Sequence, residues 1–263
     1  MREAVIVSAA RTPIGKAYRG AFNNLESPSM ASVAVKAAVD RSGIDPKEVD
    51  DCIMGAAIQQ GTQGFNLGRQ VAMASGLPVS VAGMTIDRQC SSGLMTIATG
   101  AKHIINDNAP ITIAGGCESI SLVQNEHMNS HRIGDPLTIK NAPMIHMPML
   151  DTAETVAKRY NISREAQDEY AVASQERTAD AQVRGAFDNE IVPVTAIKMI
   201  MNKETGEVTK EEVTLTKDEG NRPGTTIENL ANLKPVRNDG TITAGNASQP
   251  VSYTHLTLPT NSN

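Results

Sequence analysis

The order of apolar and polar residues predicts alternating strands and helices through the first 120 residues. Short apolar runs of strand length occupy residues 4–9, 49–56 and 111–114. Residues 81–86 have the pattern of a loop end that enters a further strand. Apolar residues recur at helical spacing in three segments between the strands, at 29–41, 66–74 and 93–105. This alternation predicts an α/β layered domain with a mainly parallel sheet and crossover helices.

The pattern changes after residue 120. Residues 121–149 are rich in Met, His, Asn and Pro and have little periodicity, which predicts an irregular excursion. Regular elements resume with helices at 152–160 and 164–184 and a strand that begins at 191–194. Ser163 is the expected N-cap of the second of these helices. Residues 203–207 are polar and contain a glycine, which is typical of an exposed hairpin tip.

Composition excludes several classes of function. The chain has 263 residues, a formal net charge of −5, 3% aromatic residues and no Trp, so it offers neither a basic track nor a stacking platform for nucleic acid. No apolar run approaches the roughly 18 residues that span a bilayer, which predicts that the protein has no membrane partner. The N-terminus has no signal-peptide pattern, and we therefore expect a cytoplasmic protein.

The three cysteines, Cys52, Cys90 and Cys117, are widely spaced and form no CxxC motif. They therefore indicate neither a disulfide framework nor a zinc knuckle. His127 and His131 have the i, i+4 spacing of a metal-binding helix, but the Glu of an HExxH motif is absent and the neighbouring residues are typical of a loop. We predict no metal site.

Cys90 stands at the junction between the apolar run that ends near Ile86 and the helical segment that begins at Gly93. At a helix N-terminus, unpaired backbone N–H groups and the helix dipole favour the thiolate over the thiol. A strand, a polar turn and a helix form an elbow that exposes the turn residue, as in serine hydrolases. Cys90 is therefore a candidate nucleophile, and the competing interpretation is a small buried apolar residue.

Six segments of the chain, in order, resemble the thiolase family, in particular its acetyl-CoA acetyltransferases and 3-ketoacyl-CoA thiolases. The resemblance extends from residue 1 to about Gln249. The segments are Ala9–Gly15, Gly64–Gln70, Asp87–Gly93, Gly115–Ser119, Ser163–Ser174 and Ala244–Ser248.

The resemblance implies a reversible acyl transfer between acyl-CoA thioesters, acetyl-CoA plus acyl-CoA giving 3-ketoacyl-CoA plus CoA, through an acyl-cysteine intermediate. Cys90 matches the acylated nucleophile of the family. His146 and Met147 match the segment that lines the pantetheine channel, and Ala244 and Ser248 match positions that contact the pantetheine arm. Coenzyme A then acts as a substrate, with no tightly bound cofactor, and the parent protein is expected to be a homo-oligomer.

In fold terms, the resemblance implies a thiolase-like layered architecture with three consecutive parts. These are an N-terminal α/β half at 1–120, an inserted loop domain for CoA and acyl binding at 121–243, and the start of a return strand with a non-family tail at 244–263. The sequence contains no Asn-Glu-Ala-Phe, Gly-His-Pro or Cys-x-Gly segment, which the second α/β half of the family supplies. We therefore expect a C-terminally truncated, catalytically incomplete chain with little turnover.

Two departures concern the binding loop and the tail. Pro148 stands where the family usually has glycine, and the region after His131 is shorter than in the family, which affects acyl-chain preference more than chemistry. The tail after Gln249 matches no thiolase segment. Two alternative functions stay open at this point: a ketoacyl synthase-type condensing enzyme, and a non-catalytic acyl-CoA-binding module.

Overall fold

The computed structural model describes residues 2–249 and 256–261. Contacts divide the chain into two compact units. Unit 1 consists of the described residues within 1–128, 187–220 and 250–263, and unit 2 consists of residues 129–186 and 221–249. This division differs from the consecutive parts 1–120, 121–243 and 244–263 that the sequence suggested, because residues 187–220 pack with the N-terminal unit.

Unit 1 contains a five-stranded sheet with the order β1-β7-β4-β2-β3. The strands are β1 (Ala4–Ala10), β2 (Val49–Gly55), β3 (Ala82–Ile86), β4 (Ile111–Gly116) and β7 (Leu256–Asn261). β2 is parallel to β3 and β4, whereas β7 is antiparallel to both of its neighbours, β1 and β4. The predicted strands are confirmed, and the predicted parallel pairing is found between β2, β3 and β4, whereas both pairings of β7 are antiparallel. β7 lies in the tail, for which the sequence predicted no element.

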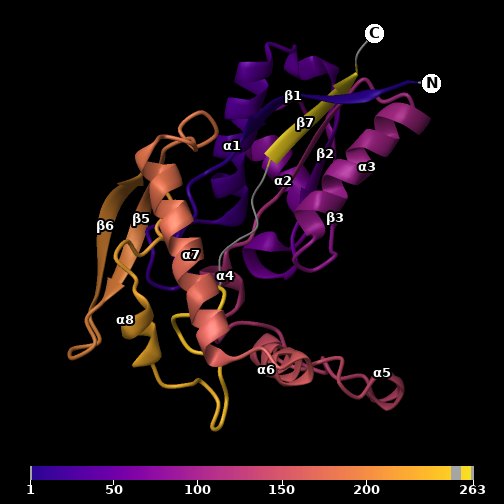
Figure 1. The fold of residues 1–263 in the computed structure, drawn as a ribbon. Coiled ribbons are helices and arrows are strands. Elements are labelled where there is room, and N and C mark those ends of the chain that lie inside the picture. Colours follow the sequence, from indigo (N-terminus) through magenta and orange to yellow (C-terminus); the bar gives the residue numbers. More distant parts are fainter. Residues whose placement is uncertain (1, 250–255, 262–263) are drawn as a thin grey trace. The chain divides into compact units, whose positions relative to one another are not determined.

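Helices cover both faces of this sheet (Figure 1). They are α1 (Ser27–Ser42), α2 (Leu67–Ala74) and α3 (Ser92–Asn106). The unit also contains 3-10 turns at Pro46–Glu48 and Gly61–Gln63 and the short α4 (Ile120–Val123), which contacts the second of these turns. α1 and α2 contact each other on one face, and α3 packs on the opposite face against β2 and β4. A parallel connection between neighbouring strands requires such crossover helices.

The core of unit 1 follows from the apolar runs that the sequence shows. β4 is buried along its whole length, and β2 is buried from Cys52 to Gly55, as expected for strands covered on both faces. α1 buries the residues of one face at 3.6 spacing and ends at Gly43, whose φ of 69° is the left-handed conformation favoured by glycine. The sheet is therefore a rigid support for the loops at the carboxyl ends of its strands.

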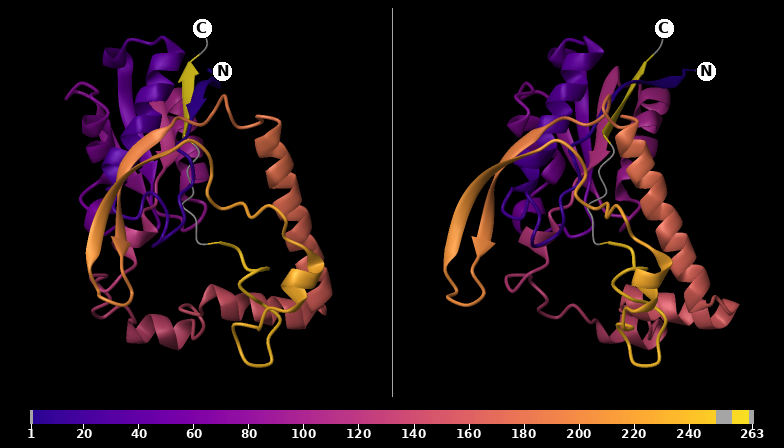
Figure 2. Two further views of the ribbon diagram at one scale, coloured as in Figure 1. Left: turned by 90° about the vertical axis from the view of Figure 1, so that its left-hand side faces the viewer. Right: turned by 60° about the vertical axis from the view of Figure 1, so that its left-hand side comes forward.

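A two-stranded hairpin completes unit 1 (Figure 2). It is formed by β5 (Val194–Met201) and β6 (Val208–Leu215), and the predicted tip at 203–207 lies between them. Val194 and Ala196 alternate inward and join the hydrophobic core of the N-terminal residues. Ile191, where the sequence placed the start of this strand, instead forms a single bridge with Arg11.

Unit 2 is built from α5 (Pro136–Asn141), α6 (Met149–Tyr160), α7 (Arg164–Val183) and α8 (Ile227–Ala231). Ser163 caps α7 as predicted, since its Oγ accepts a hydrogen bond from the N–H of Ala166 at 3.2 Å. α5 lies within the stretch for which the sequence predicted no regular structure. In the described residues, no helix has both the length and the apolarity needed to cross a membrane.

Candidate active site

Cys90 lies in the elbow between β3 and α3, one residue before the N-cap Ser91. Cys90 is exposed to solvent. The first turn of α3 contains no acidic side chain. The predicted order of strand, turn and helix is confirmed. Cys90 therefore precedes the N-terminal, positive end of a 15-residue helix.

Short hydrogen bonds define the turn that carries Cys90. Asp87 Oδ1 accepts from the N–H of Gln89 at 2.7 Å. Ser92 Oγ accepts from the N–H of Arg88 at 2.9 Å and donates to the carbonyl of Gln89 at 2.6 Å. Gln89 has a φ of 48°, a left-handed conformation that is uncommon for residues other than glycine. Local side chains thus hold an unusual backbone shape directly before the thiol.

The first turns of α3 are attached to the ends of two buried strands. Thr96 Oγ1 donates to the carbonyl of Gly115 at the end of β4, at 2.9 Å. At the end of β2, a Cβ on Gly55 would stand 2.6 Å from the carbonyl carbon of Ser92, so only glycine permits this approach. The helix end that carries Cys90 is therefore positioned by the sheet.

The other two thiols have a different environment. Cys52 and Cys117 are buried, and burial raises the pKa of each to about 12. Cys52 lies in the middle of β2, and Cys117 directly follows β4 and donates to the carbonyl of Ser27. At neutral pH both are protonated and shielded, which leaves Cys90 as the exposed cysteine.

A buried polar network lies behind the ends of β2 and β4. The carboxylate of Glu118, which is 7% exposed, accepts from the N–H of Ala57 at 2.7 Å and from Gln63 Nε2 at 2.5 Å. Gln63 Oε1 accepts in turn from Ser27 Oγ at 3.0 Å and from the N–H of Ser119 at 2.5 Å. This network fixes the Gly115–Ser119 segment, one of those on which the family resemblance rests.

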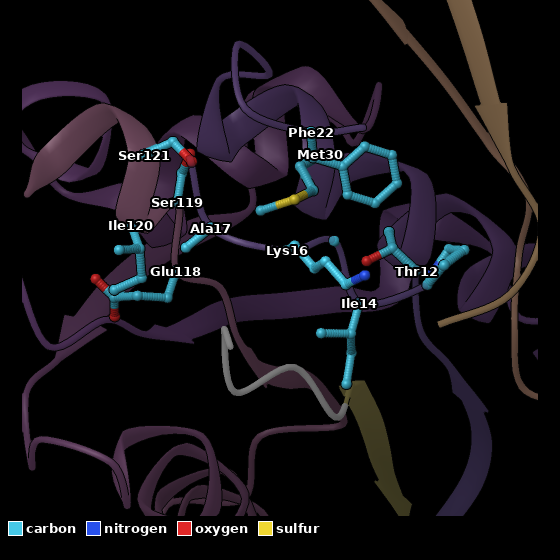
Figure 3. A pocket seen from close by; sticks show the side chains of 12 residues that line it. Thr12, Ile14, Lys16, Ala17, Phe22, Met30, Glu118, Ser119, Ile120 and Ser121 are labelled. Carbon is cyan, nitrogen blue, oxygen red and sulfur yellow. The ribbon is translucent and has the colours of Figure 1, made fainter. Parts of the chain in front are cut away.

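A cavity adjoins this network between residues 12–17 and 118–121, with Phe22 and Met30 on its wall (Figure 3). Its volume is about 30 Å³, which is enough for about two water molecules. It cannot hold a coenzyme A moiety, and it plays no part in the candidate site.

Arg11, in the Ala9–Gly15 segment, is buried within a cluster of its own. Its guanidinium binds Asp218 through two hydrogen bonds of 2.7 and 3.0 Å, binds Glu190 at 2.7 Å, and lies 5.3 Å from the centre of the Phe187 ring. Asp218 also accepts from the N–H of Ile14 at 2.8 Å. This segment therefore anchors the β5–β6 hairpin to β1, which is a structural role.

The four residues expected to bind substrate lie in unit 2, whereas Cys90 lies in unit 1. His146 is exposed and ends a turn, and Met147 is half-buried just before α6. Ala244 and Ser248 are exposed at the two ends of a second turn, which is closed by a hydrogen bond from the N–H of Ala247 to the carbonyl of Thr243.

α6 connects these two turns of unit 2. Its first residue, Met149, follows Met147 closely in the chain. Its Glu154 accepts from the N–H groups of Thr241 and Ile242 at 3.0 and 2.9 Å, directly before Ala244. Burial by itself raises the pKa of Glu154, but the hydrogen bonds from Ile242 and Thr241 outweigh it and leave the pKa below its ordinary value. The carboxylate is therefore ionised at neutral pH and attaches residues 241 and 242 to α6, which the turn at His146 and Met147 precedes in the chain.

Sequence reasoning did not assign roles to Asp87, Ser92 or Glu154. A signal was present for Asp87, since Asp commonly accepts from the N–H two residues later in a turn. Nothing in the neighbours of Ser92 indicated that its hydroxyl bridges two backbone groups. The contact of Glu154 spans 87 residues along the chain and has no local signal.

Within the described part of the chain, no group of three or more His, Cys, Asp or Glu side chains has the arrangement of a metal site. His127 and His131 both lie outside helices, so the loop that the sequence predicted around them is confirmed.

The chain matches a model of a known protein family and many known proteins. The family model is described as the thiolase N-terminal domain and matches residues 4–251. The chain is 41% identical to the 3-ketoacyl-CoA thiolase of Bacillus subtilis, over 95% of this chain and 63% of that protein. It is 39% identical to the acetyl-CoA acetyltransferase of Cupriavidus necator, over 94% of this chain and 63% of that protein.

A solved structure agrees with these sequence relatives. The crystal structure of the Bacillus anthracis acetyl-CoA acetyltransferase matches with a TM-score of 0.84 and 36% identity, over 100% of this chain and 66% of that chain. The present chain thus spans slightly less than two thirds of the length of these relatives. The expected resemblance is confirmed, and the chain belongs to the thiolase family, whose N-terminal domain it contains.

Proposed function

We propose that the protein transfers acyl groups between coenzyme A thioesters, and that Cys90 takes up the acyl group. In the first step the Cys90 thiolate attacks the carbonyl carbon of an acyl-CoA. A new C–S bond forms, the old one breaks, and the CoA thiolate leaves with the electron pair. The acyl group then passes to the sulfur of free CoA: a new C–S bond forms, the C–S bond to Cys90 breaks, the Cys90 thiolate is restored, and each step is reversible.

The observation that carries this proposal is the contrast among the three thiols. Cys90 is exposed in a fixed elbow at the start of α3, whereas Cys52 and Cys117 are buried. A thiolate both attacks and leaves a thioester readily, so the two transfers are nearly balanced in free energy. The positive end of the α3 dipole lies next to the Cys90 turn, a place of the kind that stabilises the oxyanion formed in each step.

For substrate binding, we assign the pantetheine arm to His146, Met147, Ala244 and Ser248. Support comes from their common attachment to α6 and from the matching family segments. Coenzyme A is a substrate in this scheme, and no resident cofactor is needed for the transfer. The carbon–carbon step, a homo-oligomeric state and a cytoplasmic location stay predictions for the whole protein. The Mus musculus relatives carry the name peroxisomal, so location varies among the proteins that this chain resembles.

Incubation of the purified chain with acetyl-CoA, followed by mass analysis of its peptides, tests the proposal. We expect an acetyl group on the Cys90 peptide that neutral hydroxylamine removes, as is characteristic of a thioester. The Cys90→Ser variant should lose this labile adduct. A folded sample without an acetyl group on Cys90, or with one that hydroxylamine leaves in place, would contradict the assignment. Retention of acetyl-CoA by both proteins without any adduct would instead identify a binding module.

A further inference from the structure

We propose that Asp87 and Ser92 are positioning residues that hold the Cys90 thiol at the start of α3. This inference rests on the proposed role of Cys90 as the acyl acceptor. Neither side chain touches the substrate in this scheme, and both act through the backbone on either side of Gln89.

Ser92 acts as a bridge across the turn. Its residue is 4% exposed, and its hydroxyl both accepts from the N–H of Arg88 and donates to the carbonyl of Gln89. The two hydrogen bonds, of 2.9 and 2.6 Å, use both functions of one hydroxyl. They fix the two residues that precede Cys90 relative to the first residue of the helix.

Asp87 acts from the other side of the turn. Its carboxylate accepts from the N–H of Gln89 at 2.7 Å, so Gln89 is held at its N–H by Asp87 and at its carbonyl by Ser92. A glutamine with a φ of 48° is in a conformation that costs free energy and persists only where the surroundings determine it. Backbone hydrogen bonds from the N–H groups of Ser91 and Ser92 to the carbonyls of Arg88 and Gln89 contribute to it, and the two side chains add to them.

The hydroxyl of the neighbouring Ser91 makes no comparable hydrogen bonds to any described residue. Ser91 is the N-cap residue of α3, a position at which serine usually caps the helix, yet its side chain makes no cap hydrogen bond. The donors at the helix start therefore have no serine hydroxyl competing for them from Ser91. The hydroxyl that is buried here shapes the elbow and does not cap the helix.

The consequence concerns the direction of the thiol. Gln89 sets the path of the chain into Cys90, and Ser92 is attached by close packing to Gly55 of the sheet. If Gln89 relaxes to an ordinary conformation, the Cys90 thiol no longer keeps its place at the start of the helix. Its reaction with any electrophile then slows, even in a chain that stays folded.

The test measures the rate at which iodoacetamide alkylates Cys90 in the full 263-residue chain, by mass analysis of the Cys90 peptide. We expect Ser92→Ala, which removes both hydrogen bonds of the hydroxyl, to lower this rate about tenfold, the factor that corresponds to about 1.4 kcal/mol. Ser91→Ala is the matched control and should react like the unchanged chain. Far-UV circular dichroism and thermal unfolding identify the folded samples.

If Ser92→Ala does not fold, a pair of variants at the exposed Asp87 tests the positioning role instead. Asp87→Ala should slow alkylation, and Asp87→Asn should restore it, because the amide oxygen still accepts from the N–H of Gln89. If Asp87 only stabilised the fold, Asp87→Ala would lower the unfolding temperature, and Asp87→Asn would not restore the alkylation rate. Alkylation of folded Ser92→Ala or Asp87→Ala within twofold of the unchanged chain would overturn the inference.

The test of the positioning role can fail independently of the test of the acyl-transfer proposal. Acetylation by acetyl-CoA is measured on the same samples. If the unchanged chain is never acetylated while Ser92→Ala or Asp87→Ala is alkylated more slowly than it, the acyl-transfer proposal is contradicted and the positioning role is supported. An unchanged chain that is acetylated, with variants that are alkylated equally fast, contradicts the positioning role alone.

Discussion

Gly55 and Ser92 approach each other so closely that no side chain larger than hydrogen fits on Gly55. A Cβ there would stand 2.6 Å from the carbonyl carbon of Ser92 and 2.8 Å from the N of Gly93. Both neighbours are backbone atoms, which cannot rotate away as the end of a side chain can. The carboxyl end of β2 therefore determines where α3 begins, and with it where Cys90 stands.

Gly55→Ala should consequently destabilise the protein and disturb the candidate site. We expect a loss of about 1–3 kcal/mol in the free energy of unfolding, as is typical when a methyl group is forced into a packed region. Alkylation of Cys90 should slow as well, because α3 must shift. Urea unfolding and iodoacetamide kinetics measure the two effects.

Gly134→Ala is the control for this variant, since its Cβ would approach only the flexible end of Ile139. Its stability should change by less than about 0.5 kcal/mol. A Gly55→Ala protein with unaltered stability and unaltered Cys90 kinetics would show that α3 is not held by this contact.

The burial of Cys52 and Cys117 predicts selective labelling. With pKa values raised to about 12, both thiols are almost wholly protonated at pH 8 and are also shielded from reagents. A thiol reagent should therefore modify Cys90 alone in the native chain and all three cysteines in denaturant. Mass analysis of the labelled peptides gives the count, and rapid labelling of Cys52 in the native chain would contradict the packing of β2.

The same burial predicts a loss of stability at alkaline pH. The folded state keeps the protons of Cys52 and Cys117 up to about pH 12, whereas the unfolded chain loses them near the ordinary value of 9.0. Their contribution is therefore complete below pH 9 and decreases as the pH rises from 9 toward 12, by about 1.4 kcal/mol per pH unit for each thiol. Urea unfolding at pH 8 to 11 measures this slope, and Cys52→Ala should reduce it.

Arg11 is predicted to be the most sensitive charged residue of unit 1. Burial alone would lower its pKa, but hydrogen bonds to Asp218 and Glu190 raise it above the ordinary value, so the guanidinium stays charged. Arg11→Ala removes the guanidinium from Asp218, which is 13% exposed and keeps the hydrogen bond from the N–H of Ile14, and should cost about 3 kcal/mol in urea unfolding. Arg11→Lys keeps the charge but not the paired hydrogen bonds and should cost less.

Arg184→Ala is the comparison for Arg11. It removes an ion pair with Asp180 in which both side chains are largely exposed, and such pairs contribute less than about 1 kcal/mol. Equal losses for the Arg11 and Arg184 variants would contradict the interpretation of the Arg11 cluster as a structural anchor.

The sequence predicted the elements of unit 1 well because they are long, apolar and periodic. The segments that became β2 and β4 are buried where their apolar residues lie, so burial and pattern agree. α3 has the predicted helical spacing, but it buries Ser92, Thr96 and Gly100 together with Ile104, while the apolar Leu94 is exposed. The short α5 escaped prediction because six residues are too few to show a period, although Asp135 caps it and Pro136 begins it.

The organisation of the site depends on contacts that the sequence does not reveal. The hairpin at 187–220 follows the helices of unit 2 in the chain but packs with unit 1, because the inward residues Val194 and Ala196 complete the core there. Gln63 and Glu118 meet across 55 residues. Gln89 has a left-handed conformation although it is not a glycine, so the sequence carried no signal for it. The position of Cys90 before a helix could therefore be predicted, but the hydrogen bonds that hold its turn could not.

The last prediction concerns Glu154, which holds residues 241–243 beside the Ala244 turn of unit 2. Glu154→Ala leaves the N–H groups of Thr241 and Ile242 without their acceptor and should cost about 1–3 kcal/mol. Backbone amides of residues 241–248 should then exchange with solvent about tenfold faster, which corresponds to about 1.4 kcal/mol of local stability. Hydrogen exchange measured by mass spectrometry resolves this segment.

The lowered pKa of Glu154 gives this prediction a pH dependence with a definite sign. The ionised carboxylate contributes its full stabilisation above the ordinary value of 4.5, and the contribution is lost as the pH falls through the lower pKa of the folded state. In Glu154→Ala, the amides of residues 241–248 should therefore exchange faster than in the unchanged chain at pH 7. Under acid conditions the exchange rates of the two proteins in this segment should become equal. Glu169→Gln, at an exposed position of α7, is the control and should leave exchange in this segment unaltered. If Glu154→Ala exchanges like the unchanged chain at pH 7, the carboxylate does not hold the turn, and the assignment of Ala244 and Ser248 to substrate loses its structural support.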